Sequence, residues 1–156
     1  MDDVTIARAI HVLAVVHWIG GVLFVTAVVL PAVSAMAEPT RRLEMFEAIE
    51  RRFSRQVRIS VPLAGLSGAY MAERLDIWSR FITPGGWWLM AMALAWLLFM
   101  AILFVIEPLL HQRFRRAVIG DPTGAFQRVQ RAHWVLGSAV LVVAAAAVAG
   151  AHGAWG

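Results

Sequence analysis

Four apolar stretches constrain the fold of this chain more than any other feature of its sequence. They cover residues 6–36, 57–71, 87–110 and 134–151. A helix needs about 20 mainly apolar residues to cross a bilayer, and 60% of this chain is apolar, which is more than most soluble domains contain. The second stretch is the weakest, but polar residues, proline and glycine are tolerated where neighbouring helices cover the backbone. We therefore predict an all-α fold, an integral membrane up-down four-helix bundle that forms a single domain over residues 1–156.

The helices are expected to extend beyond the membrane at one end of the bundle. Between residues 40 and 58 the apolar side chains recur at helical spacing among arginines, as in an amphipathic helix, and Thr40 is a candidate N-cap. Gly120, Asp121 and Pro122 predict a tight turn between the third and fourth helices, with Asp121 as N-cap. The residues at this spacing in the 40–58 segment are Leu43, Phe46, Ile49, Glu50 and Phe53.

The basic residues are distributed unevenly between the two ends of the predicted bundle. The chain has 14 basic residues, and because it has no lysine all of them are arginine. Most lie in the segments 41–58 and 113–131, whereas Arg8, Arg74 and Arg80 lie at the other end. The positive-inside rule then predicts a multi-pass protein of the bacterial inner (plasma) membrane with both termini in the periplasm. The lipid bilayer is its expected partner, and arginines sorted in this way do not indicate nucleic-acid binding.

Four histidines are the candidate ligands for a cofactor or metal: His11, His17, His111 and His133. An ionisable residue inside a membrane helix is functional by default, and packing is the alternative role for each of them. The absence of cysteine excludes thiolate metal sites, iron–sulfur clusters and covalent c-type haem. Neutral imidazole suits haem iron and copper. The predicted cofactor is haem b, one or two per chain, with each iron held by two histidines, and copper is the alternative.

Counting along the expected helices places these histidines at different depths. His111 and His133 flank the 113–131 segment and lie at similar heights near the inner boundary of the membrane. His17 and His11 lie progressively farther from that end on the first helix. Because they are separated by roughly 120° around it, they do not hold one iron from opposite sides. Which histidines pair on one iron stays open.

Other charged groups are expected to support such a site. Glu107 lies one turn from His111 on the same helical face, where it would orient a ligand, carry a proton or pair with Arg58. Arg58 or Arg131 would pair with haem propionates. His152 follows the last apolar stretch and is most simply a favourable cation at a helix C-terminus.

The first two helices carry a pattern found in a known family. His11, Trp18, Ile19, Gly20 and Gly21 precede Pro31, and Arg52, Phe53 and Ser54 lead into a segment with Gly65 and Gly68. These residues resemble the copper-resistance D (CopD-like) membrane family, most strongly over the first helix. The pattern H-x-x-x-V-V-x-W that starts at His11 also resembles the HemJ-type protoporphyrinogen oxidases, which are small four-helix membrane proteins that bind haem b. That resemblance implies that His11 is a haem ligand.

Three functions follow from these observations. The first is a small membrane b-type cytochrome that binds haem between its helices and transfers electrons with quinol or a redox protein, which would make it a membrane oxidoreductase. The second is a CopD-like protein that transports or imports copper, using His11, His17 and nearby methionines as transient ligands. The third is a HemJ-like oxidase, but that family carries a lysine that this chain lacks. Gly65, Gly68 and the 144–147 segment would suit either a homodimer or packing within the bundle.

Overall fold

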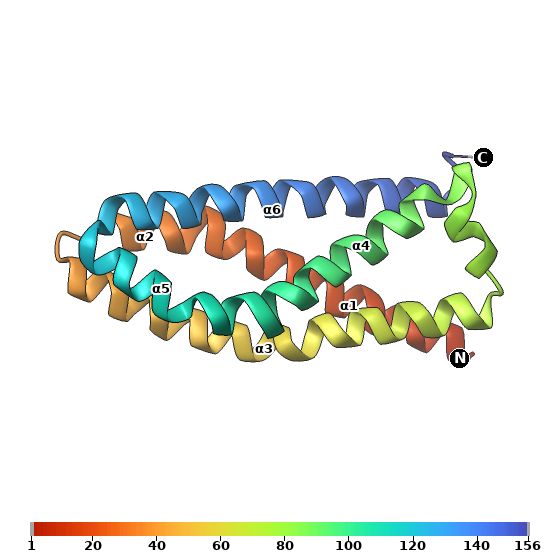
Figure 1. Cartoon of the computed structure of the whole chain (residues 1–156). Coiled ribbons are helices and arrows are strands. Elements are labelled where there is room, and N and C mark those ends of the chain that lie inside the picture. Colours follow the sequence, from red (N-terminus) through yellow and green to blue (C-terminus); the bar gives the residue numbers. More distant parts are fainter. Residues whose placement is uncertain (1, 156) are drawn as a thin grey trace.

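The chain folds into four long antiparallel helical rods (Figure 1). The computed structural model describes residues 2–155. In the first rod, a π-helical turn lies between two α-helices, and the second rod is one continuous helix. The elements of these rods are α1 (Asp3–Phe24), η1 (Val25–Val29), α2 (Leu30–Ser34) and α3 (Pro39–Arg74).

The third and fourth rods follow after a short connection of two 3-10 turns. The third rod again contains a π-helical turn, and the fourth is one continuous helix. The elements are η2 (Trp78–Ile82), η3 (Pro84–Gly86), α4 (Trp87–Ala101), η4 (Ile102–Ile106), α5 (Glu107–Gly120) and α6 (Pro122–Ala151).

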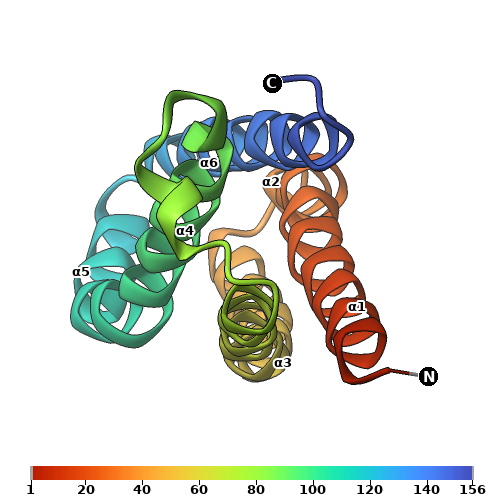
Figure 2. The same cartoon turned by 90° about the vertical axis from the view of Figure 1, so that its right-hand side faces the viewer.

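Rods that follow one another in sequence are also neighbours in space. Viewed along the bundle, α3 lies beside α1, the α4–α5 rod lies beside α3, and α6 closes the ring against α1 (Figure 2). Every regular element that the structure describes is helical. The predicted all-α, up-down four-helix bundle is confirmed.

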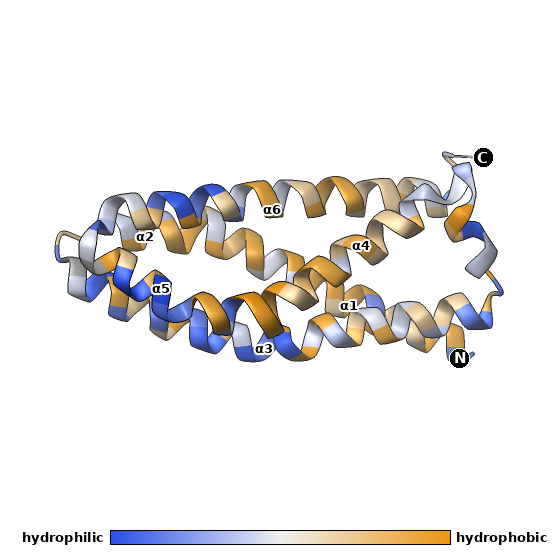
Figure 3. Cartoon of the chain, viewed as in Figure 1, coloured by the Kyte–Doolittle hydropathy of each residue, from blue (hydrophilic) through white to orange (hydrophobic). Residues whose placement is uncertain are grey.

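Three of the rods are long and apolar enough to cross a membrane. They are the segments Asp3–Ser34, Pro84–Val118 and Pro122–Ala151, of 32, 35 and 30 residues. α3 falls short because arginines recur along its first half as far as Arg58, so its apolar part is brief. Hydrophilic residues gather at the end of the bundle that holds α2, α5 and the first half of α3 (Figure 3). The chain is therefore a multi-pass membrane protein with a basic end.

Of the two helix N-caps predicted at the basic end, the structure confirms one and corrects the other. The Asp121 side chain accepts a hydrogen bond of 2.9 Å from the Gly124 N–H, which confirms it as the N-cap of α6. The prediction that Thr40 caps α3 is wrong. The helix begins one residue earlier, at Pro39, with Glu38 at the N-cap, because the fixed φ of proline suits the first helical position.

The π-helical turns η1 and η4 each lie two residues before a proline. In η4, the Glu107 N–H donates to Ile102 O, five residues back. The next carbonyl, Leu103 O, would need the N–H of Pro108, and proline has none. η1 stands in the same relation to Pro31. Proline therefore explains why a wider turn, with a displaced carbonyl, forms at these points.

Two clusters of buried residues form the core in the middle of the bundle and at its basic end. One cluster of buried residues forms around Trp18, Val61 and Phe99 in the middle of the bundle. A second forms at the basic end, where Phe46 and Phe126 pack edge to face with ring centroids 5.6 Å apart. The predicted amphipathic extension is thus anchored by an aromatic core of its own.

Small residues let aromatic and imidazole rings approach the backbone of α3. The Trp96 ring covers Gly65, and its Nε1–H donates to Val61 O at 2.9 Å. Gly68 lies under His11, where an added Cβ would be 3.2 Å from the imidazole Cε1. Of the two roles left open for these glycines, the structure shows packing within the bundle.

Candidate functional site

A cavity of about 350 Å³ lies inside the bundle toward its basic end. Aliphatic and aromatic side chains from all four rods make most of its wall. Its charged, imidazole and hydroxyl groups come from three rods: Glu50 and Ser54 of α3, Glu107 and His111 of α5, and His133 of α6. Groups that are far apart in sequence therefore share one mainly apolar space.

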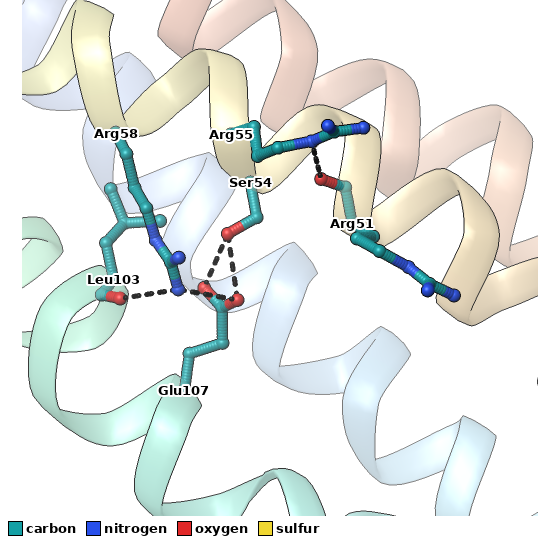
Figure 4. A network of polar contacts seen from close by, with 6 residues as sticks. All are labelled: Arg51, Ser54, Arg55, Arg58, Leu103 and Glu107. Carbon is teal, nitrogen blue, oxygen red and sulfur yellow. Dashed lines mark hydrogen bonds and ion pairs between the residues drawn. The ribbon is translucent and has the colours of Figure 1, made fainter.

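Glu107 lies at the centre of a polar network in the cavity wall (Figure 4). The Ser54 hydroxyl lies 2.8 and 3.0 Å from its two carboxylate oxygens, and Arg58 Nη2 lies 3.3 Å from Oε1. Arg58 Nη2 also lies 3.4 Å from Leu103 O, the carbonyl that Pro108 leaves without a backbone donor. The predicted pairing of Glu107 with Arg58 is confirmed, and the π-helical turn adds a second acceptor for the same guanidinium.

Glu50 lines the cavity one turn before Ser54. Burial, and to a smaller extent the negative charges of Glu107 and Glu47, raise the pKa of Glu50 to about 7 against the opposing effect of Arg58. A carboxyl with this pKa exchanges a proton near neutral pH. The cavity therefore contains one carboxyl that is held in an ion pair and one that titrates.

The two histidines of the cavity lie on neighbouring helices. His133 Nδ1 lies 3.0 Å from Val129 O. Because a carbonyl oxygen only accepts, this contact places the proton on Nδ1 and leaves Nε2 of the neutral ring as an acceptor or ligand. His111 lines the same cavity from α5 and is half-buried. Their common cavity agrees with the similar depth predicted for them.

Trp18 contributes a further polar group to the cavity wall. Its side chain is 5% exposed, and its ring meets that of Phe99 edge-on with centroids 4.8 Å apart. The buried Nε1–H donates to no residue that the structure describes. A buried donor without an acceptor costs about 1–3 kcal/mol, so Trp18 is packed here at the expense of one hydrogen bond.

His11 and His17 lie outside this cavity and connect α1 to α3. The His11 Nδ1–H donates to Ala64 O at 2.8 Å. His17 lies between Ser60 Oγ, 3.1 Å from Nδ1, and Gln56 Oε1, 3.2 Å from Nε2. Both rings therefore have interhelical partners, so the four candidate histidines fall into two separate places. Their role as ligands stays a prediction.

No group of three or more His, Asp or Glu side chains in residues 2–155 is arranged to hold a metal ion. His152 also lies apart from the cavity, with its Nδ1 2.8 Å from Val148 O of the preceding turn. The cavity thus offers separate donors on its wall instead of a closed coordination cage.

Three cavity residues with polar groups were not assigned to a functional site from the sequence: Trp18, Glu50 and Ser54. A signal for two of them was present, since an acidic residue and a serine one turn apart interrupt the apolar face of an amphipathic helix. Trp18 carried no such signal, because a tryptophan in an apolar helix is ordinarily core or an interfacial anchor.

Comparison with models of known families identifies the family to which the chain belongs. The model of the family described as Copper resistance protein D matches residues 47–147. The chain belongs to the CopD family. No match was found among curated proteins or among solved structures.

The CopD match is distributed differently from the resemblance seen in the sequence. It starts within α3 and runs through most of α6, so it omits α1, where the resemblance is strongest. The matched residues include Glu50, Ser54, Glu107, His111 and His133, but not His11 or His17. The CopD part of this chain therefore contains the polar groups that α3, α5 and α6 contribute to the cavity.

Proposed function

We propose that this CopD-family protein transports copper ions through or into the membrane, with the cavity as a transient binding place. The observation that carries the proposal is that two imidazoles and two carboxylates from three rods share one cavity in a membrane protein of this family. Imidazole suits copper, and a carboxylate offsets the charge of a cation in a surrounding of low polarity.

The donors in the cavity suit transient binding of an ion during transport better than tight, permanent binding. His133 Nε2 is free to accept a cation while Nδ1–H is held by Val129 O. His111 and Glu50 offer further donors on adjacent helices. Conduction requires binding that is favourable enough for entry and weak enough for release. A wall with separate donors meets this requirement better than a closed cage of three or four ligands.

The proposed orientation places the basic end in the cytoplasm and both termini in the periplasm. The support is the positive-inside rule, since arginines of α3, α5 and the first half of α6 gather at that end. In this orientation the cavity lies nearer the cytoplasmic face, and an ion reaches Glu50 and His111 after it has entered the membrane from the periplasmic side.

Copper flux into proteoliposomes that contain a copper-sensitive dye tests the proposal. The double variant His111→Ala/His133→Ala should lower the initial rate by about tenfold or more, a loss of the size seen when groups that support a metal site are removed. His152→Ala is the matched control, because His152 is exposed and outside the cavity. Wild-type protein that gives no more copper flux than empty liposomes would refute transport, and an unchanged double variant would refute the site.

Binding of haem b is a second candidate function, with electron transfer to quinol or a redox protein. It is favoured by the presence of His111 and His133 in one cavity that is mostly aliphatic and aromatic. These two histidines would hold the iron of one haem, and Arg58 would offer a guanidinium to a propionate. His17 is less available as a ligand, because both of its ring nitrogens contact side chains of α3. The haem would supply one-electron redox chemistry when bound.

A reduced-minus-oxidised visible spectrum with a pyridine haemochrome count separates the two functions. A six-coordinate haem b spectrum that disappears in His133→Ala and persists in His17→Ala would establish a haem in the cavity. Purified protein without such a spectrum after expression with ample haem would exclude this function and leave the copper assay as the test of the first.

A further inference from the structure

A second hollow lies on the surface of α3, away from the cavity. It is lined by Arg52, Arg55, Gln56 and Ile59. These residues are spaced by three, four and seven positions, so they share one face of the helix. The hollow therefore presents two guanidinium groups, one amide and one aliphatic side chain in a row along the axis.

The two arginines of this hollow are available to an anion. Arg55 extends away from the Glu107 network, and its Nε–H donates to Arg51 O at 3.3 Å (Figure 4). In the part of the chain that the structure describes, neither Arg52 nor Arg55 forms an ion pair. Guanidinium presents several N–H donors in a planar fork that matches a phosphate group.

The hollow lies where the basic end of the bundle meets its apolar surface. Ile59 is 65% exposed and lies about 6 Å along the axis from Arg55. On α1, which reaches the hollow through the contact of His17 with Gln56, Val16 and Leu13 are 63% and 69% exposed. The change from hydrophilic to hydrophobic residues along α3 is visible in Figure 3. A ligand at this place would meet positive charge at one end and an aliphatic surface at the other.

A polar contact between the helices forms one edge of the hollow. Gln56 Oε1 lies 3.2 Å from His17 Nε2, and His17 also meets Ser60. Since the amide oxygen of Gln56 is used here, its NH₂ group remains as a donor beside the arginines. The interhelical contact thus fixes one side of the hollow without neutralising its charge.

We propose that this hollow binds an anionic phospholipid, with the phosphate on Arg52 and Arg55 and an acyl chain along Ile59 and the exposed face of α1. The positive charge selects an anionic headgroup, and the adjoining aliphatic surface selects a lipid over free phosphate. The site is separate from the cavity, so it does not depend on the copper or haem function.

Native mass spectrometry of the full chain in detergent, titrated with phosphatidylglycerol or phosphatidylcholine, tests the site. The wild type should hold one phosphatidylglycerol more tightly than phosphatidylcholine. Arg52→Gln/Arg55→Gln should weaken that first binding step by about tenfold or more, since each surface arginine contributes measurably to anionic lipid binding. Arg113→Gln/Arg116→Gln removes the same charge from exposed positions on α5 and is the matched control.

The possible results separate a defined site from general attraction. Retention of tight binding in the control pair, and its loss in Arg52→Gln/Arg55→Gln, would support the proposal. Equal weakening in both pairs would overturn it in favour of diffuse electrostatics. Displacement of phosphatidylglycerol by millimolar inorganic phosphate would also overturn it, because the site would then select the anion alone. Circular dichroism of each variant verifies that it is folded. The conservative variant Arg52→Lys/Arg55→Lys keeps both positive charges and should retain part of the affinity for phosphatidylglycerol.

Discussion

A single carboxyl, that of Glu50, gives the cavity a pH-dependent stability. Its pKa of about 7 lies above the ordinary value of 4.5, mainly because burial disfavours the charged form. The folded protein is therefore favoured while Glu50 is protonated, and this contribution is lost as pH rises from about 4.5 to about 7. Glu50→Gln should raise the thermal midpoint in detergent at pH 8 and change it little at pH 5.

The control for this prediction is Glu44→Gln on the same helix. Glu44 is exposed, so its substitution should give the same small change at both pH values. A Glu50→Gln effect that is equal at pH 5 and pH 8 would contradict the raised pKa. A Glu50→Gln variant that is less stable than the wild type at pH 8 would show that the charged form of Glu50 is stabilised by a partner in the folded protein.

The ion pair of Glu107 and Arg58 affects the stability of the fold mainly because removal of one partner leaves the other partly buried and unpaired. Glu107→Ala removes the acceptor of Ser54 and Arg58 together, so it should lower the free energy of unfolding by about 1–3 kcal/mol. Glu107→Gln keeps an acceptor oxygen and should lose less. Denaturant titration in detergent measures both. Equal losses for the two variants would mean that the acceptor oxygen kept by glutamine contributes nothing and that loss of the charge accounts for the effect.

At the scale of helices, contacts between glycine and rings decide how closely the rods approach. A Cβ at Gly65 would overlap the Trp96 ring, which is also held by its hydrogen bond to Val61 O. Gly65→Ala should therefore destabilise the protein by about 1–3 kcal/mol, the usual cost of overpacking. Gly20 is the matched control, because nothing lies within 4 Å of its added Cβ.

Gly20→Ala should be neutral or stabilise the protein by up to about 1 kcal/mol, since alanine restricts the unfolded chain and favours the helix. Thermal midpoints of the two variants in the same detergent make the comparison. Similar losses at both positions would indicate that loss of glycine flexibility, and not the Trp96 contact, determines the effect.

The helices themselves could be predicted from the sequence, whereas their local irregularities could not. Length and apolar character fix a membrane helix, and the Asp121–Pro122 turn has its own chemical signal. The π-helical turns η1 and η4 depend on how the helix accommodates Pro31 and Pro108 within the packed bundle. A proline in the sequence predicts a disturbance of the helix but not its form.

The candidate site was predictable only in part for a similar reason. His111 and His133 flank one turn, so counting residues placed them at the same depth. For His11 and His17 the depth alone was insufficient, because a helix that is apolar on all sides does not reveal which face meets which neighbour. Their contacts with α3 required the packed structure.

The whole molecule combines a basic end and an apolar body, and this asymmetry bears on how many times the chain crosses the membrane. Three rods meet the length and composition of a membrane span, whereas α3 does not, because only its second half is mainly apolar. Because α3 packs along α1 and closes the ring of four rods, it has to lie at the same depth as the others (Figure 2). We therefore expect four crossings and both termini on one side.

Reporter fusions test this topology. Alkaline phosphatase, which is active only in the periplasm, should be active when fused after Trp155 and inactive when inserted at the Gly120–Asp121 turn. A green fluorescent protein at the same two positions should give the reverse pattern. Because α3 is the weakest span, an N-terminal fusion decides its position: activity of the phosphatase at both termini requires four crossings. Termini on opposite sides of the membrane would show that α3 does not cross it. The basic first half of α3 would then place this helix at the membrane surface as an interfacial helix.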